Sequence, residues 1–152
     1  MKKPNFFKRT LYKTELLPCS IYKPVNDLIF VTGANSKFFK KLNNFLESAI
    51  KYEGNSKIIV YDLGLTQEEI KNINNTFQNI FVRKFDFSKY PEWLDISKNA
   101  GEYAWKPIII NEVLHENKCS VCWMDSANLI FTHLNDLRTI LSKYGFYSPK
   151  SL

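Results

Sequence analysis

The sequence predicts an α/β fold, a Rossmann-like αβα sandwich with a mostly parallel sheet. Short, continuously apolar runs, typical of strands buried on both faces, recur along the chain. Between them lie longer segments whose apolar residues repeat every three or four positions, as on one face of a helix. Strands that alternate with helices indicate βαβ units, which pair in parallel with right-handed crossovers.

The first predicted strand, Leu28–Val31, is followed by a loop of small polar residues, Thr32–Ser36. Ser36 is expected to cap a helix that begins near Lys37 and stops at Gly54. The apolar face of this helix comprises Phe38, Phe39, Leu42, Phe45, Leu46, Ala49 and Ile50.

The second predicted strand and its following loop span Lys57–Gly64, and a third strand spans Ile80–Phe85. Between them, Thr66–Glu69 forms a capping-box sequence, which predicts the start of a helix that continues to about Phe77. The aromatic segment Asp86–Gly101 is expected to be irregular.

A third helix is expected from about Glu102 to Glu116, and it leads into a buried strand at Ser120–Trp123. A last helix is predicted over Asn135–Tyr144, with Gly145 at its end. The 152 residues are most simply one domain: an irregular extension, 1–25, followed by an α/β domain, 26–152.

The composition favours a packed protein, with 45% hydrophobic and 15% aromatic residues. Its net charge of +6 permits contact with phosphates, but the lysines are scattered, so nucleic acid is weakly indicated. No apolar run reaches the length of a transmembrane helix or a signal peptide, so a cytoplasmic location is expected. Cys119 and Cys122 open a buried strand, where core cysteines are favoured over a redox pair or a zinc site.

Two polar groups are expected where predicted strands end. Asp125 follows the strand Ser120–Trp123, and ligands of α/β sheets gather outside the carboxyl ends of the strands. Its carboxylate is placed to meet a ligand directly or through a metal, with a capping role as the alternative. The stretch Thr32-Gly33-Ala34 offers backbone N–H groups for a base, ribose or phosphate, with an ordinary strand-to-helix turn as the alternative.

Other candidate residues also have two interpretations. Asp62 could bind a ribose or form a turn with its own backbone. Lys106 stands beside Tyr103 and Trp105, where it could reach a diphosphate or lie as a surface lysine with its stem across an aromatic ring. His133 could approach Asp125, but a lone histidine is more often structural. The sequence contains no hydrolase elbow or metal-spaced histidine pair.

Taken together, these segments resemble the nucleotide-binding half of glycosyltransferases with the A-type fold. The resemblance extends over roughly 26–148 and is closest to a little-studied group with a Trp-x-Asp-small-small motif. The matching segments are LIFVTGANS (Leu28–Ser36), KIIVYDLGLT (Lys57–Thr66), YAWKP (Tyr103–Pro107) and WMDSANLIF (Trp123–Phe131).

The resemblance implies a nucleotide diphosphate sugar as donor, most simply of the UDP type, and an acceptor that the sequence does not identify. Cofactor-binding positions would be Thr32, Gly33, Ala34 and Asp62 around the base and ribose, with Lys106 near the diphosphate and Asp125 on ribose, a divalent cation, or both. Lys106 and Asp125 would also serve the catalytic step.

This chain departs from the resemblance at Ala127, which stands where the second Asp of the Asp-x-Asp pair is expected. The expected Mn²⁺ or Mg²⁺ site would therefore keep only one of its two carboxylates, Asp125. Lys106 or a second lysine could then take the place of the cation beside the diphosphate. Only about 25 residues follow Asp125, and a homo-oligomer or partner chain would complete the acceptor site. The alternatives are a non-catalytic nucleotide-sugar-binding or assembly subunit, and a basic module for RNA or protein.

Overall fold

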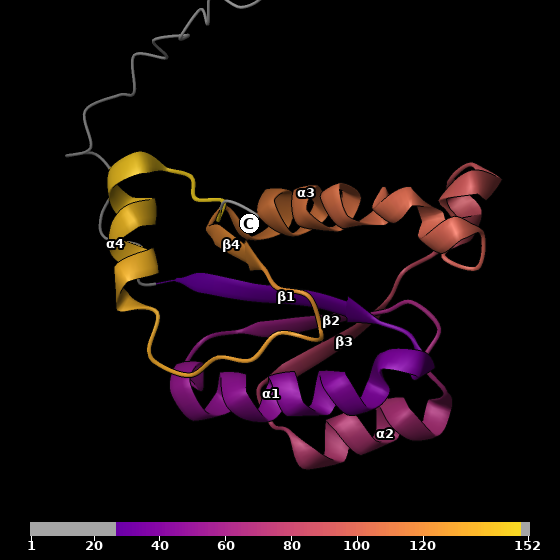
Figure 1. Ribbon diagram of the computed structural model, residues 1–152, viewed down its shortest axis with the longest axis horizontal. Helices are drawn as coiled ribbons and strands as arrows, with labels where there is room; N and C mark the ends of the chain where they lie inside the picture. The colour runs from indigo at the N-terminus through magenta and orange to yellow at the C-terminus, as the bar shows by residue number, and fades with distance from the viewer. Residues whose placement is uncertain (1–26, 150–152) are drawn as a thin grey trace, which may run out of the picture.

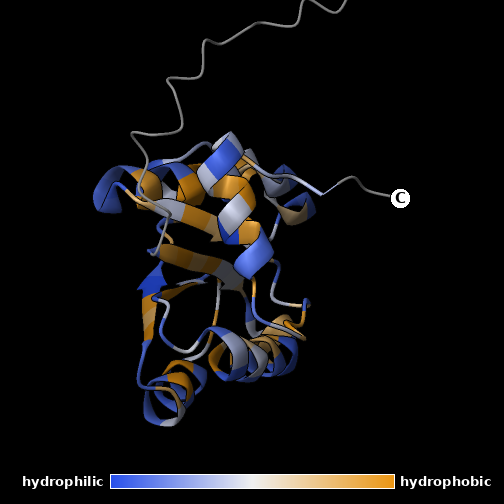
Figure 2. Cartoon of the chain, turned by 90° about the vertical axis from the view of Figure 1, so that its left-hand side faces the viewer, coloured by the Kyte–Doolittle hydropathy of each residue, from blue (hydrophilic) through white to orange (hydrophobic). Residues whose placement is uncertain are grey.

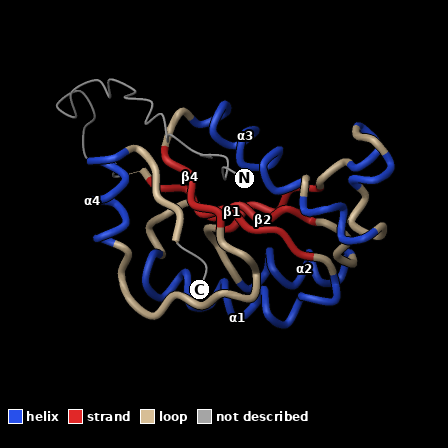
Figure 3. The backbone as a smooth tube through the Cα atoms, turned by 45° about the horizontal axis from the view of Figure 1, so that its top comes forward, coloured by secondary structure: helices blue, strands red, loops and turns tan. Residues whose placement is uncertain are grey.

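The computed structural model describes residues 27–149, so the extension expected at 1–25 lies outside the described residues. The α/β prediction is confirmed: four parallel strands form one sheet with helices on both of its faces (Figures 1 and 3). The strands are β1 (Leu28–Ala34), β2 (Ile58–Asp62), β3 (Ile80–Lys84) and β4 (Ser120–Trp123). The α-helices are α1 (Phe39–Glu53), α2 (Gln67–Thr76), α3 (Trp105–Asn117) and α4 (Asn135–Tyr144).

The strand order is β3-β2-β1-β4, so the direction in which strands are added reverses after β3. The chain lays down β1, β2 and β3 side by side and then returns through α3 to place β4 on the other side of β1. α1 and α2 cover one face of the sheet, and α3 covers the other (Figure 1). The carboxyl ends of β1 and β4 therefore meet at a topological switch point.

Two apolar layers enclose the sheet. Leu28 and Phe30 of β1 point toward α1, whereas Ile29 and Val31 point toward α3. Every residue of β1 and β2 is buried, which explains why both strands read as continuous apolar runs. Figure 2 shows hydrophobic residues concentrated along the strands and hydrophilic ones on the outer surface of α4.

The first strand is longer than predicted. Thr32, Gly33 and Ala34 were expected in a loop, but they continue β1 and pair with β2 as far as Ala34 opposite Asp62. The lack of a side chain at Gly33 has a packing reason, because a Cβ atom there would lie 3.0 Å from the Leu63 side chain and 3.4 Å from the Trp123 ring. The loop prediction was wrong because small residues also suit a strand that is tightly covered.

The loops that follow β1 and β2 are tied together. The Ser36 amide donates to the Gly64 carbonyl at 3.1 Å, and the Ser36 hydroxyl lies 3.1 Å from that carbonyl and 2.6 Å from the Glu69 carboxylate. Asn35, rather than the expected Ser36, caps the short 3-10 turn Ser36–Phe38 that precedes α1. The predicted capping box of α2 is confirmed, with Thr66 and Glu69 bonded reciprocally.

The segment before α3 contains 3-10 turns at Phe87–Lys89, Glu92–Leu94 and Asn99–Tyr103. The last turn is left-handed: its five residues have φ between +47° and +60°. α3 therefore begins at Trp105 rather than at the expected Glu102. Gly101 allows this turn, because a Cβ atom there would lie 2.1 Å from the Leu94 carbonyl oxygen.

The connection from β4 to α4 runs back along α1. The Ile130 amide donates to the Ser48 hydroxyl at 3.1 Å, and the Leu134 amide donates to the Glu53 carboxylate at 2.7 Å. Glu53 also pairs with Arg138 of α4, which anchors that helix to the end of α1. Within residues 27–149, no helix is long and apolar enough to cross a membrane.

Candidate functional site

Lys106 and Asp125 meet at the switch point. Lys106 lies in the first turn of α3, and Asp125 follows β4 by two residues. The Lys106 ammonium is 2.7 Å from Asp125 Oδ1, and the indole Nε1 of Trp123 donates to the same oxygen at 2.9 Å. Two residues that the sequence singled out separately thus form one polar group at the end of the sheet where ligands of this fold class bind.

Three aromatic rings surround the lysine. Its Nζ lies 5.0 Å from the ring centroid of Tyr103, 5.6 Å from that of Trp105 and 5.8 Å from that of Trp123. These distances are typical of cation–π contacts, as the interpretation with the lysine stem across an aromatic ring predicts. The Lys106 ammonium is thus paired with Asp125 and lies among aromatic rings. We call Tyr103, Trp105, Lys106, Trp123 and Asp125 the lysine–aromatic site.

The left-handed turn positions the aromatic part of this site. Trp105 is 5% exposed and donates from Nε1 to the Ala100 carbonyl at 3.0 Å, so it fastens the turn to α3. The Trp105 and Trp123 rings pack edge to face, with centroids 5.7 Å apart. Tyr103, the last residue of the turn, is 59% exposed. The site therefore presents one open ring beside a buried aromatic support.

The Asp125 carboxylate is ionised at neutral pH. Partial burial alone would raise the pKa of Asp125, but hydrogen bonds from Lys106 and Trp123 and the Lys106 charge outweigh it and hold the pKa below the ordinary value. The Asp125 side chain is 55% exposed, against 26% for that of Lys106, so the pair is accessible to a ligand from the aspartate side.

Replacing Lys106 by methionine is expected to raise the pKa of Asp125, because the carboxylate loses its cationic partner. A depressed carboxyl pKa adds stability above the unfolded-state pKa, and this stability is lost as the pH falls through the folded-state pKa. The stability difference between wild type and Lys106→Met should therefore shrink on acidification. NMR titration of the Asp125 carboxyl carbon tests this, and an unchanged pKa in the variant would contradict the pairing.

Asp62 adopts the turn role that was its alternative interpretation. Its Oδ1 accepts hydrogen bonds from the amides of Gly64, at 2.8 Å, and Leu65, at 2.6 Å. The residue is 8% exposed and lies on β2, with β1 between it and β4. The structure does not bring Asp62 next to Asp125.

The three candidate residues on β1 are also buried. Thr32 is 0% exposed and Ala34 is 2% exposed. The space where a side chain of Gly33 would lie is taken by Leu63 and Trp123. The Thr32 hydroxyl has no hydrogen-bond partner among the described residues. Gly33 nevertheless bears on the site, because the Trp123 ring that reaches Asp125 packs over it.

Residues 27–149 contain no group of three or more His, Cys, Asp or Glu side chains arranged to hold a metal ion. His133 lies edge to face with Tyr52 at 5.9 Å, in the structural role that was favoured for it. Cys119 packs in the α3 layer and Cys122 in the α1 layer, so the two thiols face opposite sides of the sheet. Burial raises the pKa of Cys122 to about 11, which makes it a poor nucleophile.

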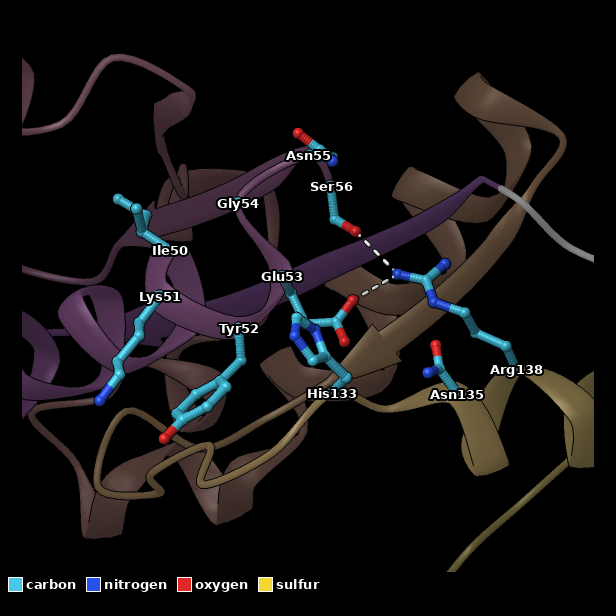
Figure 4. A pocket seen from close by; sticks show the side chains of 10 residues that line it. All are labelled: Ile50, Lys51, Tyr52, Glu53, Gly54, Asn55, Ser56, His133, Asn135 and Arg138. Atoms are coloured by element: carbon cyan, nitrogen blue, oxygen red, sulfur yellow. Dashed lines mark hydrogen bonds and ion pairs between the residues drawn. The ribbon is translucent and has the colours of Figure 1, made fainter.

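A cavity of about 570 Å³ that was not predicted from the sequence lies at the carboxyl end of α1 (Figure 4). On one side of it, the Arg138 guanidinium donates to the Glu53 carboxylate at 2.5 Å and to the Ser56 hydroxyl at 2.9 Å. No local pattern could reveal this ion pair, since its partners are 85 residues apart. The lining residues are Ile50, Lys51, Tyr52, Glu53, Gly54, Asn55, Ser56, His133, Asn135 and Arg138.

The fold and the site together define an α/β domain with a lysine–aspartate pair at its strand-order reversal. The chain matches the family described as "Protein of unknown function (DUF1647)" over residues 14–111 and belongs to that family. The matched residues include β1, β2, β3 and Lys106, whereas β4 and Asp125 follow them. No curated protein matches the chain.

Proposed function

We propose that this protein is a glycosyltransferase-like domain that binds a nucleotide diphosphate sugar at the lysine–aromatic site and transfers the sugar to an acceptor. The observation that carries the proposal is the contact between Lys106 and Asp125 at the carboxyl ends of β1 and β4. A cation for phosphate and a carboxylate for hydroxyl groups lie together there, in the place where α/β sheets bind nucleotides.

Each residue of the site has a role in this proposal. Lys106 contacts the diphosphate and stabilises its charge as it departs, and it is held there by the rings around it. Asp125 accepts hydrogen bonds from the ribose hydroxyls through its exposed side. Tyr103 offers its open ring for stacking on the base. Asp62 supports the loop after β2 from within.

A divalent cation has little room in this arrangement. Mn²⁺ or Mg²⁺ would have to compete with the Lys106 ammonium for Asp125 Oδ1, and the second carboxylate of the usual pair is replaced by Ala127. The proposal therefore gives Lys106 the charge-neutralising role and leaves the metal an auxiliary one. We also propose that a partner chain or second copy completes the acceptor site, and that the protein is cytoplasmic.

Lys106→Ala and Asp125→Ala are each expected to weaken binding of UDP or of another nucleoside diphosphate by about 10- to 100-fold, the range for losing a charged hydrogen bond. Calorimetric titration of a nucleotide panel with and without Mn²⁺ measures this. Lys71→Ala is the control, since Lys71 is an exposed lysine on α2 and has the same charge. Equal affinity of all four proteins for every nucleotide, or no binding at all, would refute the nucleotide site.

A non-catalytic nucleotide-sugar-binding subunit is the second candidate, favoured by Ala127. It predicts the same binding and the same effect of the variants, but no release of sugar from the nucleotide. Incubation of the wild type with the sugar form of the nucleotide it binds and with candidate acceptors, followed by chromatography for the released nucleoside diphosphate, separates the two. Retention of the intact nucleotide sugar with every acceptor tried would favour the binding subunit.

A further inference from the structure

Two hydrogen-bond donors converge on one oxygen atom of Asp125. The Lys106 ammonium lies 2.7 Å from Oδ1, and the Trp123 indole Nε1 donates to the same atom at 2.9 Å. Within residues 27–149, no group donates to the other oxygen, Oδ2. A carboxylate can accept about four hydrogen bonds, so Oδ2 is available to a ligand on the exposed side of the residue.

The backbone after β4 explains why the Trp123 indole reaches Asp125. Side chains two positions apart on an extended chain lie on the same side of the sheet. The extended pairing continues past the end of β4, because the Met124 amide donates to the Val31 carbonyl at 2.9 Å. The Asp125 carbonyl then accepts from the Asn128 amide at 2.9 Å, which closes a turn directly after it. Trp123 and Asp125 are therefore neighbours on one side of the sheet.

The Trp123 ring is itself held in place by its neighbours. It belongs to the apolar layer between the sheet and α3, where it packs edge to face against Trp105 with centroids 5.7 Å apart. Toward β1 it lies so close to Gly33 that a Cβ atom there would be only 3.4 Å away. A donor on a ring packed in this way stays aimed at Asp125 with little further loss of conformational entropy.

Lys106 is the less permanent of the two partners. Its ammonium sits on a flexible four-carbon stem, and in the proposed function it contacts the diphosphate of the ligand. A lysine that turns toward a phosphate weakens its bond to Asp125. The indole offers a single neutral N–H, which gains nothing by leaving the carboxylate. Trp123 is therefore the donor that can keep Asp125 in place while Lys106 is engaged by a ligand.

We propose that Trp123 is a positioning residue of the lysine–aromatic site: its indole N–H holds Oδ1 of Asp125, so that Oδ2 faces the ligand while Lys106 binds the diphosphate. Since an ionised carboxylate only accepts hydrogen bonds, the ligand group that meets Oδ2 is a donor such as a hydroxyl. The inference rests on the proposed function for its ligand, but the hydrogen bond from Trp123 to Asp125 can be tested without one.

NMR of the wild type without ligand tests the bond first. The chain has three tryptophans and therefore three indole N–H signals. The Trp123 signal should shift with pH at the same midpoint as the Asp125 carboxyl carbon, because protonation of the acceptor weakens the bond. The signal of Trp93, which is 55% exposed and lies outside the site, is the internal control and should not follow that titration. A Trp123 signal that ignores the titration of Asp125 would overturn the proposal.

Replacing Trp123 by benzothienylalanine removes the N–H and keeps the shape of the ring. The pKa of Asp125 should rise, because the carboxylate loses a donor while its burial is unchanged. The Kd for UDP should increase by about 3- to 10-fold, the range for losing one neutral hydrogen-bond donor. Trp123→Phe should show both changes and a lower stability, since its ring is smaller. Trp93→Phe is the control and should alter neither quantity.

The possible outcomes separate this inference from the proposed function. If the benzothienylalanine protein keeps the wild-type pKa of Asp125, the positioning role of Trp123 is refuted. The same follows if the wild type binds UDP and the substituted protein binds it equally well. If the wild type binds no nucleoside diphosphate, the proposed function fails, and the pKa of Asp125 alone then decides whether Trp123 positions the carboxylate.

Discussion

Replacing Gly101 by alanine is expected to lower the free energy of unfolding by about 3 kcal/mol or more. Alanine at φ +60° costs roughly 1–2 kcal/mol in itself, because the left-handed region is unfavourable for residues with a Cβ atom. The added Cβ would also lie 2.1 Å from the Leu94 carbonyl oxygen, a distance that forces two backbone segments apart. Urea denaturation followed by tryptophan fluorescence measures the loss.

Gly145→Ala supplies the matched control. Gly145 ends α4 at φ +73° and has no atom within 4 Å of an added Cβ. Its replacement should cost only the conformational penalty of about 1 kcal/mol. An equal loss of unfolding free energy in the two variants would show that the turn at Gly101 can shift to accept a Cβ atom without strain. A loss confined to Gly101 would show that the segment in front of Lys106 is rigidly packed against Leu94.

Arg138→Ala should destabilise the protein by about 3 kcal/mol, because it leaves the Glu53 carboxylate buried without its cationic partner. The Glu53 side chain is 5% exposed, and Arg138 lies 2.5 Å from it. The remaining hydrogen bond from the Leu134 amide cannot replace a charge. Chemical denaturation of both proteins at neutral pH gives the difference directly.

Two further variants control for helix α4 itself. Thr139→Ala changes an exposed neighbour on the same helix and should alter stability by no more than about 0.5 kcal/mol. Arg138→Lys keeps the charge but not the planar guanidinium, so an intermediate loss is expected. A neutral outcome for Arg138→Ala would mean that Glu53 finds water in the adjoining cavity and that the pair contributes nothing net.

The fold was largely predictable because β1 and β2 are buried on both faces. That burial requires apolar residues at every position, and such runs are visible in a sequence. Strand ends were less predictable, since they depend on pairing with a neighbour rather than on local composition. Thr32, Gly33 and Ala34 resemble a loop, yet the partner strand β2 extends beside them and keeps them in the sheet.

The start of α3 illustrates a different limit. Pattern alone allows Glu102 in the helix, because it follows a glycine and precedes an apolar face. The helix begins later, since the 3-10 turn before it is left-handed as far as Tyr103. That handedness depends on the fit of Gly101 against Leu94, and the two residues approach each other only in the folded chain.

The candidate site was predictable in its parts but not in its assembly. Lys106 and Asp125 each stood out as a charged residue beside apolar segments at the end of an element. Their contact depends on the strand order, which places β4 beside β1 and α3 above it, and no local pattern specifies that order. Asp62 was ambiguous for a related reason, because a carboxylate after a strand suits a turn as well as a ligand.

The bonds among Ser36, Gly64 and Glu69 have a consequence for how the rim of the sheet responds to an incoming molecule. They hold the loops after β1 and β2 together in one conformation, so these loops should lose little conformational entropy when a ligand binds. Among the described residues, no hydrogen bond joins the segment that carries Asp125 to these two loops. On ligand binding, the loop after β4 should therefore change conformation, while the loops after β1 and β2 stay as they are.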